Sequence, residues 1–227
     1  MKTKRWMFPL LGMFLVAFIS CEKGNDDIGK PTVQLAFETV TSGSALKSTA
    51  TNNLEFTSGN IILESIEFET DSEADSLEVD FEIDSYITLD FATGETDPDV
   101  SSVEITPGTF TEIEIELWDQ TDEPAIVLDG TWTDADGNIH PVRFEFSSGQ
   151  TFEVEKEGEF IIEQSTAMIA EITFDPNVWF SGVTAEKLSS ATTDDEGVIV
   201  ISSGQNTDIY DIVEDKIDVV SEVEISM

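Results

Sequence analysis

The alternation of apolar and acidic residues is the strongest pattern in this chain, and it predicts β-strands. In 77–84, Leu77, Val79, Phe81 and Ile83 alternate with acidic residues, and in 112–117, Ile113, Ile115 and Leu117 alternate with glutamates. A period of two places one set of side chains on a buried face and the other on a wet face. Both stretches are therefore expected to be half-buried strands.

Weaker patterns predict further strands at 32–37, 61–69, 127–133, 139–146, 151–155, 160–164, 167–174, 198–201 and 219–225. The alternation in 61–69 breaks near Glu64 and Ser65, which predicts a β-bulge. Asp136 and Gly137 supply the positive φ of a tight hairpin between 127–133 and 139–146. Residues 39–53 carry little to bury and are expected to form a long mobile loop.

Two short helices are expected near the C-terminus. Thr184 is placed to cap the first, which runs through Leu188, and Asn206 or Thr207 is placed to cap the second. In the second helix Ile209, Ile212, Val213 and Ile217 fall on one stripe. The predicted fold is mostly β, an antiparallel β-sandwich with two short C-terminal helices, a barrel being the alternative, in one domain over residues 32–227.

The first 21 residues predict export and lipidation. Lys2, Lys4 and Arg5 precede an apolar run over 6–19, and Ser20 precedes Cys21, the only cysteine. This run is shorter than the roughly twenty residues of a membrane-spanning helix, so residues 1–20 are expected to be a cleaved signal peptide, with an uncleaved membrane anchor as the alternative. Phe18-Ile19-Ser20-Cys21 resembles a bacterial lipobox, which implies a lipid on Cys21.

Residues 21–31 are then expected to be the lipidated cysteine and a polar tether. The acidic stretch 22–27 resembles the signals that send lipoproteins of Bacteroidota to the outer cell face, whereas a plain linker would leave the protein in the periplasm. The expected location is the outer membrane, on its periplasmic or cell-surface side.

The charge of the chain excludes one class of partner. Three of the ten basic residues and none of the 48 acidic ones precede Cys21, which leaves seven against 48 and a net charge of −41 from Cys21 onward. A phosphate backbone requires clustered Lys and Arg, so nucleic acid is not an expected partner. A hydrophobic content of 40% with 15 Phe argues against disorder. No second cysteine is present, so packing without disulfides must supply the stability.

Several landmarks carry a family resemblance: Phe56-Thr57-Ser58-Gly59, the stretch 107–113, the stretch 130–138, and Phe174-Asp175-Pro176 with Trp179-Phe180. Together they resemble a family of uncharacterised Bacteroidota lipoproteins whose domain is similar to transthyretin-like β-sandwiches. The resemblance covers about residues 54–225. It implies a location and a fold, and no site residue is carried over from it.

Catalytic chemistry is not expected. His140 is the only histidine, which excludes a multi-histidine zinc site and leaves a His-dependent triad without support. No P-loop, dinucleotide-binding, zinc-protease or serine-hydrolase motif occurs. A glycosidase-like carboxylate pair needs a cleft, and spacing cannot select two acids from 48.

Calcium is the one cofactor for which the sequence offers candidate ligands. Asp134, Asp136 and Asn138 alternate as at the start of an EF-hand, with Glu145 at the twelfth position, but Ile139 stands where that loop needs Gly. A hairpin is therefore favoured there. Looser candidates for a metal are Asp97, Asp99, Asp194 and Asp195, each also typical of a solvated turn.

Trp118 is the candidate ligand-binding residue. Strand parity places it on the wet face with Glu112, Glu114 and Glu116, whereas Trp132 shares the parity of the core. An exposed Trp beside acids is a possible sugar-stacking platform, and the alternative is a ring that folds over the sandwich edge.

The expected function is a non-enzymatic, lipid-anchored envelope or surface module acting in recognition or structure. A glycan-binding lipoprotein is the first alternative and a pilus-type assembly subunit the second. The expected partners are the membrane, through the lipid, and a glycan or another envelope protein.

Overall fold

The computed structural model describes residues 31–41, 53–69, 86–105, 107–118, 123–147, 156–163, 167–217 and 222–226. Two predicted strands, 77–84 and 151–155, lie outside these residues, as do Cys21, the tether and most of the loop predicted over 39–53. Within the described part the fold is mostly β with short helices, which confirms the predicted fold class.

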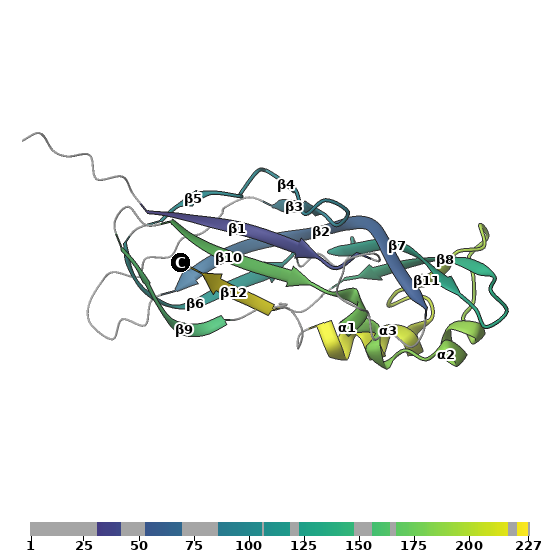
Figure 1. Ribbon diagram of the computed structural model, residues 1–227. Helices are drawn as coiled ribbons and strands as arrows, with labels where there is room; N and C mark the ends of the chain where they lie inside the picture. The colour runs from purple at the N-terminus through teal and green to yellow at the C-terminus, as the bar shows by residue number, and fades with distance from the viewer. Residues whose placement is uncertain are drawn as a thin grey trace, which may run out of the picture.

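Two sheets form the body of the molecule (Figure 1). The smaller sheet has the order β12 (Glu222–Ser226), β10 (Ala167–Phe174), β1 (Thr32–Thr39) and β5 (Val103–Glu104). The larger sheet has the order β11 (Ile199–Ile201), β8 (Ile139–Phe146), β7 (Ile126–Thr133), β2 (Leu54–Glu69), β3 (Ile87–Asp90) and β4 (Thr96–Asp97). β6 (Gly108–Leu117) also pairs with β2, and β9 (Lys156–Ile162) pairs with β6.

Most strand pairs are antiparallel, as predicted, but two are parallel. β1 runs parallel to β10 over its whole length, from Thr32 opposite Ala167 to Thr39 opposite Phe174. β11 runs parallel to β8. Hydrophobic alternation reports which face of a strand is buried and not which strand lies beside it, so neither pair was predicted.

The long strand β2 organises the larger sheet. Along one edge it pairs first with β7 and then with β6, and on the opposite edge it pairs with β3. β6 and β7 therefore lie end to end along the same edge. The sequence pattern predicted only 61–69 of this strand.

Two bulges interrupt β2, one in the first half, which was missed, and one in the half that was predicted. The pairing shifts between Phe56 and Ser58 and again between Leu63 and Ser65, so Thr57 and Glu64 are extra residues in the ladder. The second shift confirms the bulge predicted at Glu64. Because each bulge changes the parity of the strand, the buried apolar residues fall at even positions, then at odd ones, then at even ones again. They are Leu54, Phe56, Ile61, Leu63, Ile66 and Phe68.

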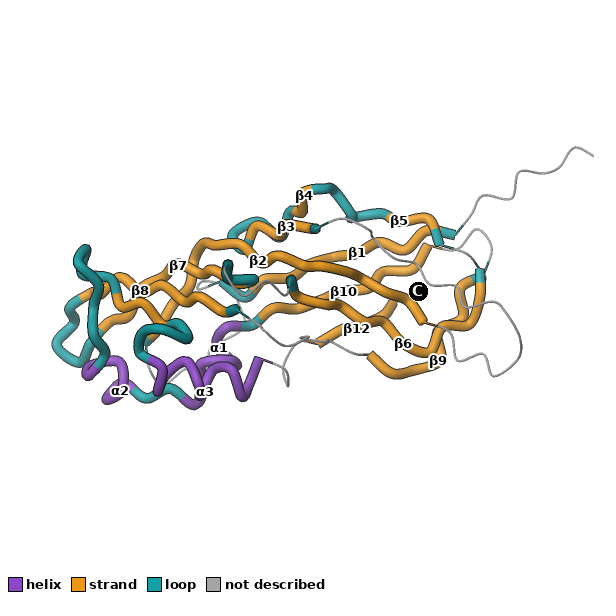
Figure 2. Tube along the Cα trace, turned by 180° about the vertical axis from the view of Figure 1, so that it is seen from behind, coloured by secondary structure: helices purple, strands orange, loops and turns teal. Residues whose placement is uncertain are grey.

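The helices lie together at one end of the elongated molecule, opposite the end where β1 begins (Figures 1 and 2). They are α1 (Pro176–Trp179), the 3₁₀ turn η1 (Phe180–Gly182), α2 (Ala185–Ser190) and α3 (Thr207–Ile217). Thr184 caps α2 as predicted, since its hydroxyl accepts a hydrogen bond from the Lys187 backbone N–H. α1 was not predicted, because it has only four residues; it follows Asp175 as its N-cap.

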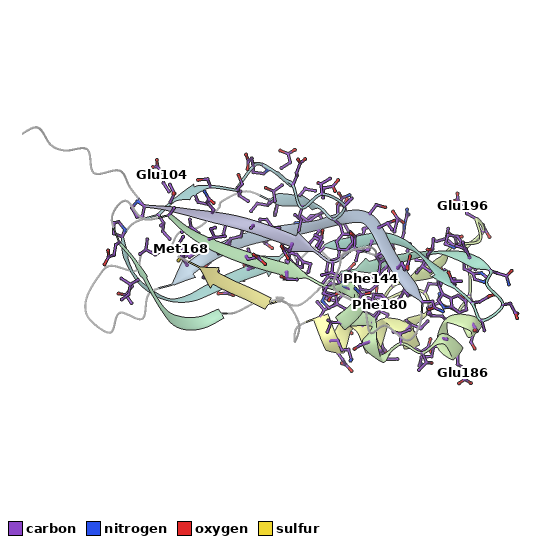
Figure 3. All side chains as sticks on the ribbon, in the orientation of Figure 1. Glu104, Phe144, Met168, Phe180, Glu186 and Glu196 are labelled. Atoms are coloured by element: carbon purple, nitrogen blue, oxygen red, sulfur yellow. The ribbon has the colours of Figure 1, made fainter. Side chains whose placement is uncertain are left out.

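Aromatic side chains join the helices to the larger sheet. The ring of Phe180 lies 5.2 Å from that of Phe144 on β8 and 5.0 Å from that of Phe56 on β2 (Figure 3). Trp179 is fully buried, and Phe180 is nearly so. The ring contacts of Phe180 therefore pack the helical end of the molecule onto the larger sheet.

Candidate functional site

Trp118 meets a second aromatic residue that sequence reasoning did not select. The ring centroids of Tyr86 and Trp118 lie 5.7 Å apart in an edge-to-face arrangement. Tyr86 has an exposed fraction of 56%, and Trp118 is half-buried and packs against the core. The pair, called the Tyr86–Trp118 platform below, therefore has one ring in solvent and one supported from beneath.

The larger sheet fixes both rings from either edge of β2. Leu63 of β2 pairs with Ile87 of β3 on one edge and with Leu117 of β6 on the other. Tyr86 directly precedes Ile87, and Trp118 directly follows Leu117. Tyr86 and Trp118, which are distant in the sequence, are thus brought together because their strands flank β2 at the same residue, Leu63.

Ile62 holds the backbone of Trp118 in place. The Trp118 N–H donates to the Ile62 carbonyl at 3.1 Å, and the Ile62 N–H donates to the Ala125 carbonyl at 2.8 Å. The carbonyl of Ile62 therefore fixes the end of β6, and the N–H of Ile62 fixes the start of β7. A binding residue held by a sheet in this way needs little ordering when a ligand arrives.

The chain and the strand register place carboxylates beside the platform. Glu64 is the extra residue of the bulge and follows Leu63, while Glu116 lies two residues before Trp118 and accepts a hydrogen bond of 2.9 Å from the Ser65 hydroxyl. Glu123 is exposed at the other end of the excursion between β6 and β7. Carboxylate oxygens accept hydrogen bonds from hydroxyl groups, so a stacking surface and hydrogen-bond acceptors occur together here.

The row of acids continues along the sheet. Glu67 of β2 lies directly opposite Glu114 of β6 in the register, and both side chains are half-buried. Like charges in directly opposed positions destabilise a ladder. The Glu67–Glu114 pair is therefore one place where the acidic composition produces electrostatic repulsion within the sheet.

The hairpin between β7 and β8 uses Asp134 to close its turn. Asp134 Oδ1 accepts hydrogen bonds from the backbone N–H groups of Asp136 at 2.9 Å and Asn138 at 2.8 Å, and Oδ2 accepts one from Asn138 Nδ2 at 2.9 Å. Gly137 has the positive φ, 85°, that the turn requires. The predicted hairpin is thereby confirmed.

His140 lies over Trp132 beside this turn. Its Nε2 is 3.1 Å from Asp134 Oδ2, and its ring stacks on Trp132 with centroids 5.0 Å apart. The hydrogen bonds from the Asn138 side chain and from His140 hold the pKa of Asp134 well below its ordinary value. Trp132 is buried in the core, as its parity predicted.

The other metal candidates also lie in turns or at strand ends. Asp194 Oδ1 accepts hydrogen bonds from the backbone N–H groups of Glu196 and Val198, both at 2.9 Å, in the same pattern as Asp134. Asp99 Oδ1 accepts one from the Ser101 N–H at 2.9 Å, and hydrogen bonds from the Ser101 side chain and backbone lower the pKa of Asp99. Asp97 ends β4, and Asp195 is exposed. Within the described ranges, no three His, Cys, Asp or Glu side chains gather as a metal site.

None of the helices in the described residues is long and apolar enough to cross a membrane. Comparison with known proteins gives no match to a family model, to a curated protein or to a solved structure.

Proposed function

We propose that the chain is a lipid-anchored, non-enzymatic module of the outer membrane that recognises a glycan through Tyr86 and Trp118. The observation that carries this proposal is the edge-to-face contact of the two rings, one exposed and one supported by the core. Tyr and Trp present a large apolar face with few rotatable bonds and are enriched where binding energy concentrates. An aromatic face of this kind suits the apolar face of a sugar ring.

The flanking acids complement the aromatic rings. Glu116 lies on β6, two residues before Trp118, and Glu123 is exposed nearby in the chain. A few polar groups around an apolar contact fix the orientation of a ligand and supply specificity. Sugar hydroxyls donate the hydrogen bonds that such carboxylates accept.

A binding assay with the full-length chain in nonionic detergent tests the proposal. The probes are soluble neutral polysaccharides, namely an α-mannan, a β-glucan, a dextran and an arabinoxylan, measured by affinity electrophoresis. At least one is expected to retard the protein, and Tyr86→Ala is expected to weaken that binding about tenfold, because the exposed ring is lost. Trp118→Ala should weaken it further.

Ile139→Ala is the matched control. Ile139 is also an exposed apolar residue of the larger sheet, with an exposed fraction of 69%, but it starts β8 beside the hairpin turn. Its replacement should leave binding unchanged. Equal loss in Tyr86→Ala and Ile139→Ala, or no retardation by any of the four polysaccharides, would contradict the proposed site.

Lipidation of Cys21 is tested separately by membrane fractionation. The wild-type protein is expected in the outer-membrane fraction, because several acyl chains, at about 0.8 kcal/mol per buried methylene, hold a protein firmly where one chain holds it weakly. Cys21→Ala should release the protein or leave its signal peptide uncleaved. A Cys21→Ala protein that is processed normally and stays in the membrane would overturn the anchor.

A further inference from the structure

We infer that the Tyr86–Trp118 platform selects uncharged glycans and rejects those that carry carboxylate or sulfate groups. The inference rests on the proposed function and specifies the class of its ligand. Two observations support it: the charged residues beside the two rings are acidic, and the cations with described side chains lie elsewhere.

Every charged side chain that the register and the chain place beside the platform is acidic. Glu64 lies in the bulge, directly after Leu63. Leu63 pairs with the residue after Tyr86 on one edge of β2 and with the residue before Trp118 on the other edge. Glu116 is two residues from Trp118, and Glu123 stands two residues before Ala125, which is hydrogen-bonded to Ile62. An anionic sugar at the platform would meet these like charges at short range.

The cations whose side chains the structure describes lie elsewhere and have partners. Arg143 Nε donates to Asp129 Oδ1 at 2.8 Å on β8 and β7. Lys187 Nζ donates to Asp208 Oδ2 at 2.7 Å, and Lys216 Nζ donates to Ser181 Oγ at 2.6 Å. Both lysines belong to the helices, which lie together at one end of the molecule (Figure 1).

Recognition of a carboxylate or sulfate commonly uses a fork of donors from Arg or a point charge from Lys. The described surface of the platform offers neither group. The rest of the molecule also repels an anionic glycan, because the chain from Cys21 onward has 48 acidic residues and only seven basic ones. A field of one sign lowers the association rate of a ligand of the same sign, as it raises the rate for the opposite sign.

The test compares one polysaccharide in two charge states. The tightest neutral polysaccharide of the panel is oxidised in part at its primary hydroxyls to carboxylates, which keeps the backbone and adds only charge. At about 0.01 M salt, where the Debye length is about 30 Å, the oxidised polymer is expected to bind the full-length protein about tenfold more weakly than the neutral one. At about 0.15 M salt this gap should narrow, and binding of the neutral polymer should stay constant.

Two charge variants locate the effect. Glu123→Gln should strengthen binding of the oxidised polymer at low salt by about twofold, because one like charge near the platform is removed. Glu186→Gln removes a charge that is also exposed, at the helical end of the molecule, and should change binding of the oxidised polymer less (Figure 3). Glu186→Gln should leave binding of the neutral polymer unchanged, and the effect of Glu123→Gln is taken as the change in the ratio of oxidised-polymer binding to neutral-polymer binding.

The outcomes separate this inference from the proposed function. Equal or tighter binding of the oxidised polymer at low salt, lost in Tyr86→Ala, overturns the charge selection and leaves the platform as the glycan site. The same overturning follows if Glu186→Gln and Glu123→Gln act alike. If neither the neutral nor the oxidised polymers bind, the proposed function itself fails.

Discussion

At the scale of single residues, several acidic side chains have a structural role, because they accept hydrogen bonds from backbone N–H groups. Asp134 and Asp194 close two turns of the same design, and Asp175 caps α1 by accepting a hydrogen bond from the Asn177 N–H at 2.8 Å. Short carboxylates suit such places because they accept hydrogen bonds from backbone groups that would otherwise lack partners. Part of the high acid content is therefore structural.

Replacing Asp134 tests this role. Asp134→Ala removes the acceptor of two backbone and two side-chain groups and should lower the melting temperature, whereas Asp136→Ala, at an exposed position of the same turn, should leave it nearly unchanged. Thermal unfolding followed by circular dichroism measures both. Equal melting temperatures for the two variants would contradict the role.

The same variant carries a pH dependence. The pKa of Asp134 is lowered in the folded state, so the unfolded chain binds the proton more readily. The stabilisation by Asp134 is therefore present above its ordinary pKa of about 4 and is lost as the pH falls below that value. The difference in melting temperature between wild type and Asp134→Ala should shrink between about pH 4 and pH 2. A difference that grows on acidification would show the opposite linkage.

Residue-level reasoning from the sequence succeeded where the local pattern carries the information. Strand parity predicted that Trp132 is buried, and the Asp136-Gly137 pair predicted the hairpin turn. Both are local signals. Tyr86 was missed because it precedes a strand of only four residues, Ile87–Asp90. The alternation of Ile87 and Leu89 with Thr88 and Asp90 was the available signal, but its link to Trp118 exists only through β2.

At the scale of elements, the bulges of β2 decide which residues reach the core. Glu64 is the extra residue, so the strand without it should form a regular ladder that still presents Leu63 and Ile66 to the core. Sequence alternation predicts regular strands well and fails where a bulge changes the parity. Alternation is regular over 112–117, β7 and β8, which were predicted, and it breaks at Thr57, which is why 54–60 was not predicted.

Two single-residue deletions test the role of the bulge. Deletion of Glu64 should leave a folded protein with a modest loss of stability. Deletion of Ile62 shortens the strand equally, but it turns Leu63 outward and places Glu64 in the core. A buried, unpaired carboxylate costs on the order of 3–5 kcal/mol, so this variant should unfold or lose cooperative melting. Calorimetry distinguishes the two, and similar melting of both variants would refute the assigned bulge.

At the scale of the whole molecule, the net charge sets how stability responds to salt. Glu67 and Glu114 oppose each other in the ladder, and few cations offset the acids. The repulsion weakens as the Debye length falls from about 30 Å at 0.01 M salt to about 8 Å at 0.15 M. The melting temperature should therefore rise with sodium chloride over this range. A melting temperature indifferent to salt would contradict the repulsion.

Calcium provides the control for this experiment. Millimolar calcium at matched ionic strength should raise the melting temperature no further if the aspartate turns hold only backbone and side-chain donors, as Asp134 does. An added increase that Asp134→Ala abolishes would identify that turn as a calcium site.

The parallel pairing of β1 with β10 has a consequence for the time course of folding. Val33 and Leu35 are buried in the sheet that the two strands share, and Thr32 finds its partner in Ala167. At the usual synthesis rate of about 5–20 residues per second, β1 exists for roughly ten seconds before β10 has been made. Contacts so distant in the chain form slowly. During that interval the apolar face of β1 needs a chaperone or a temporary neighbour to keep it from aggregating.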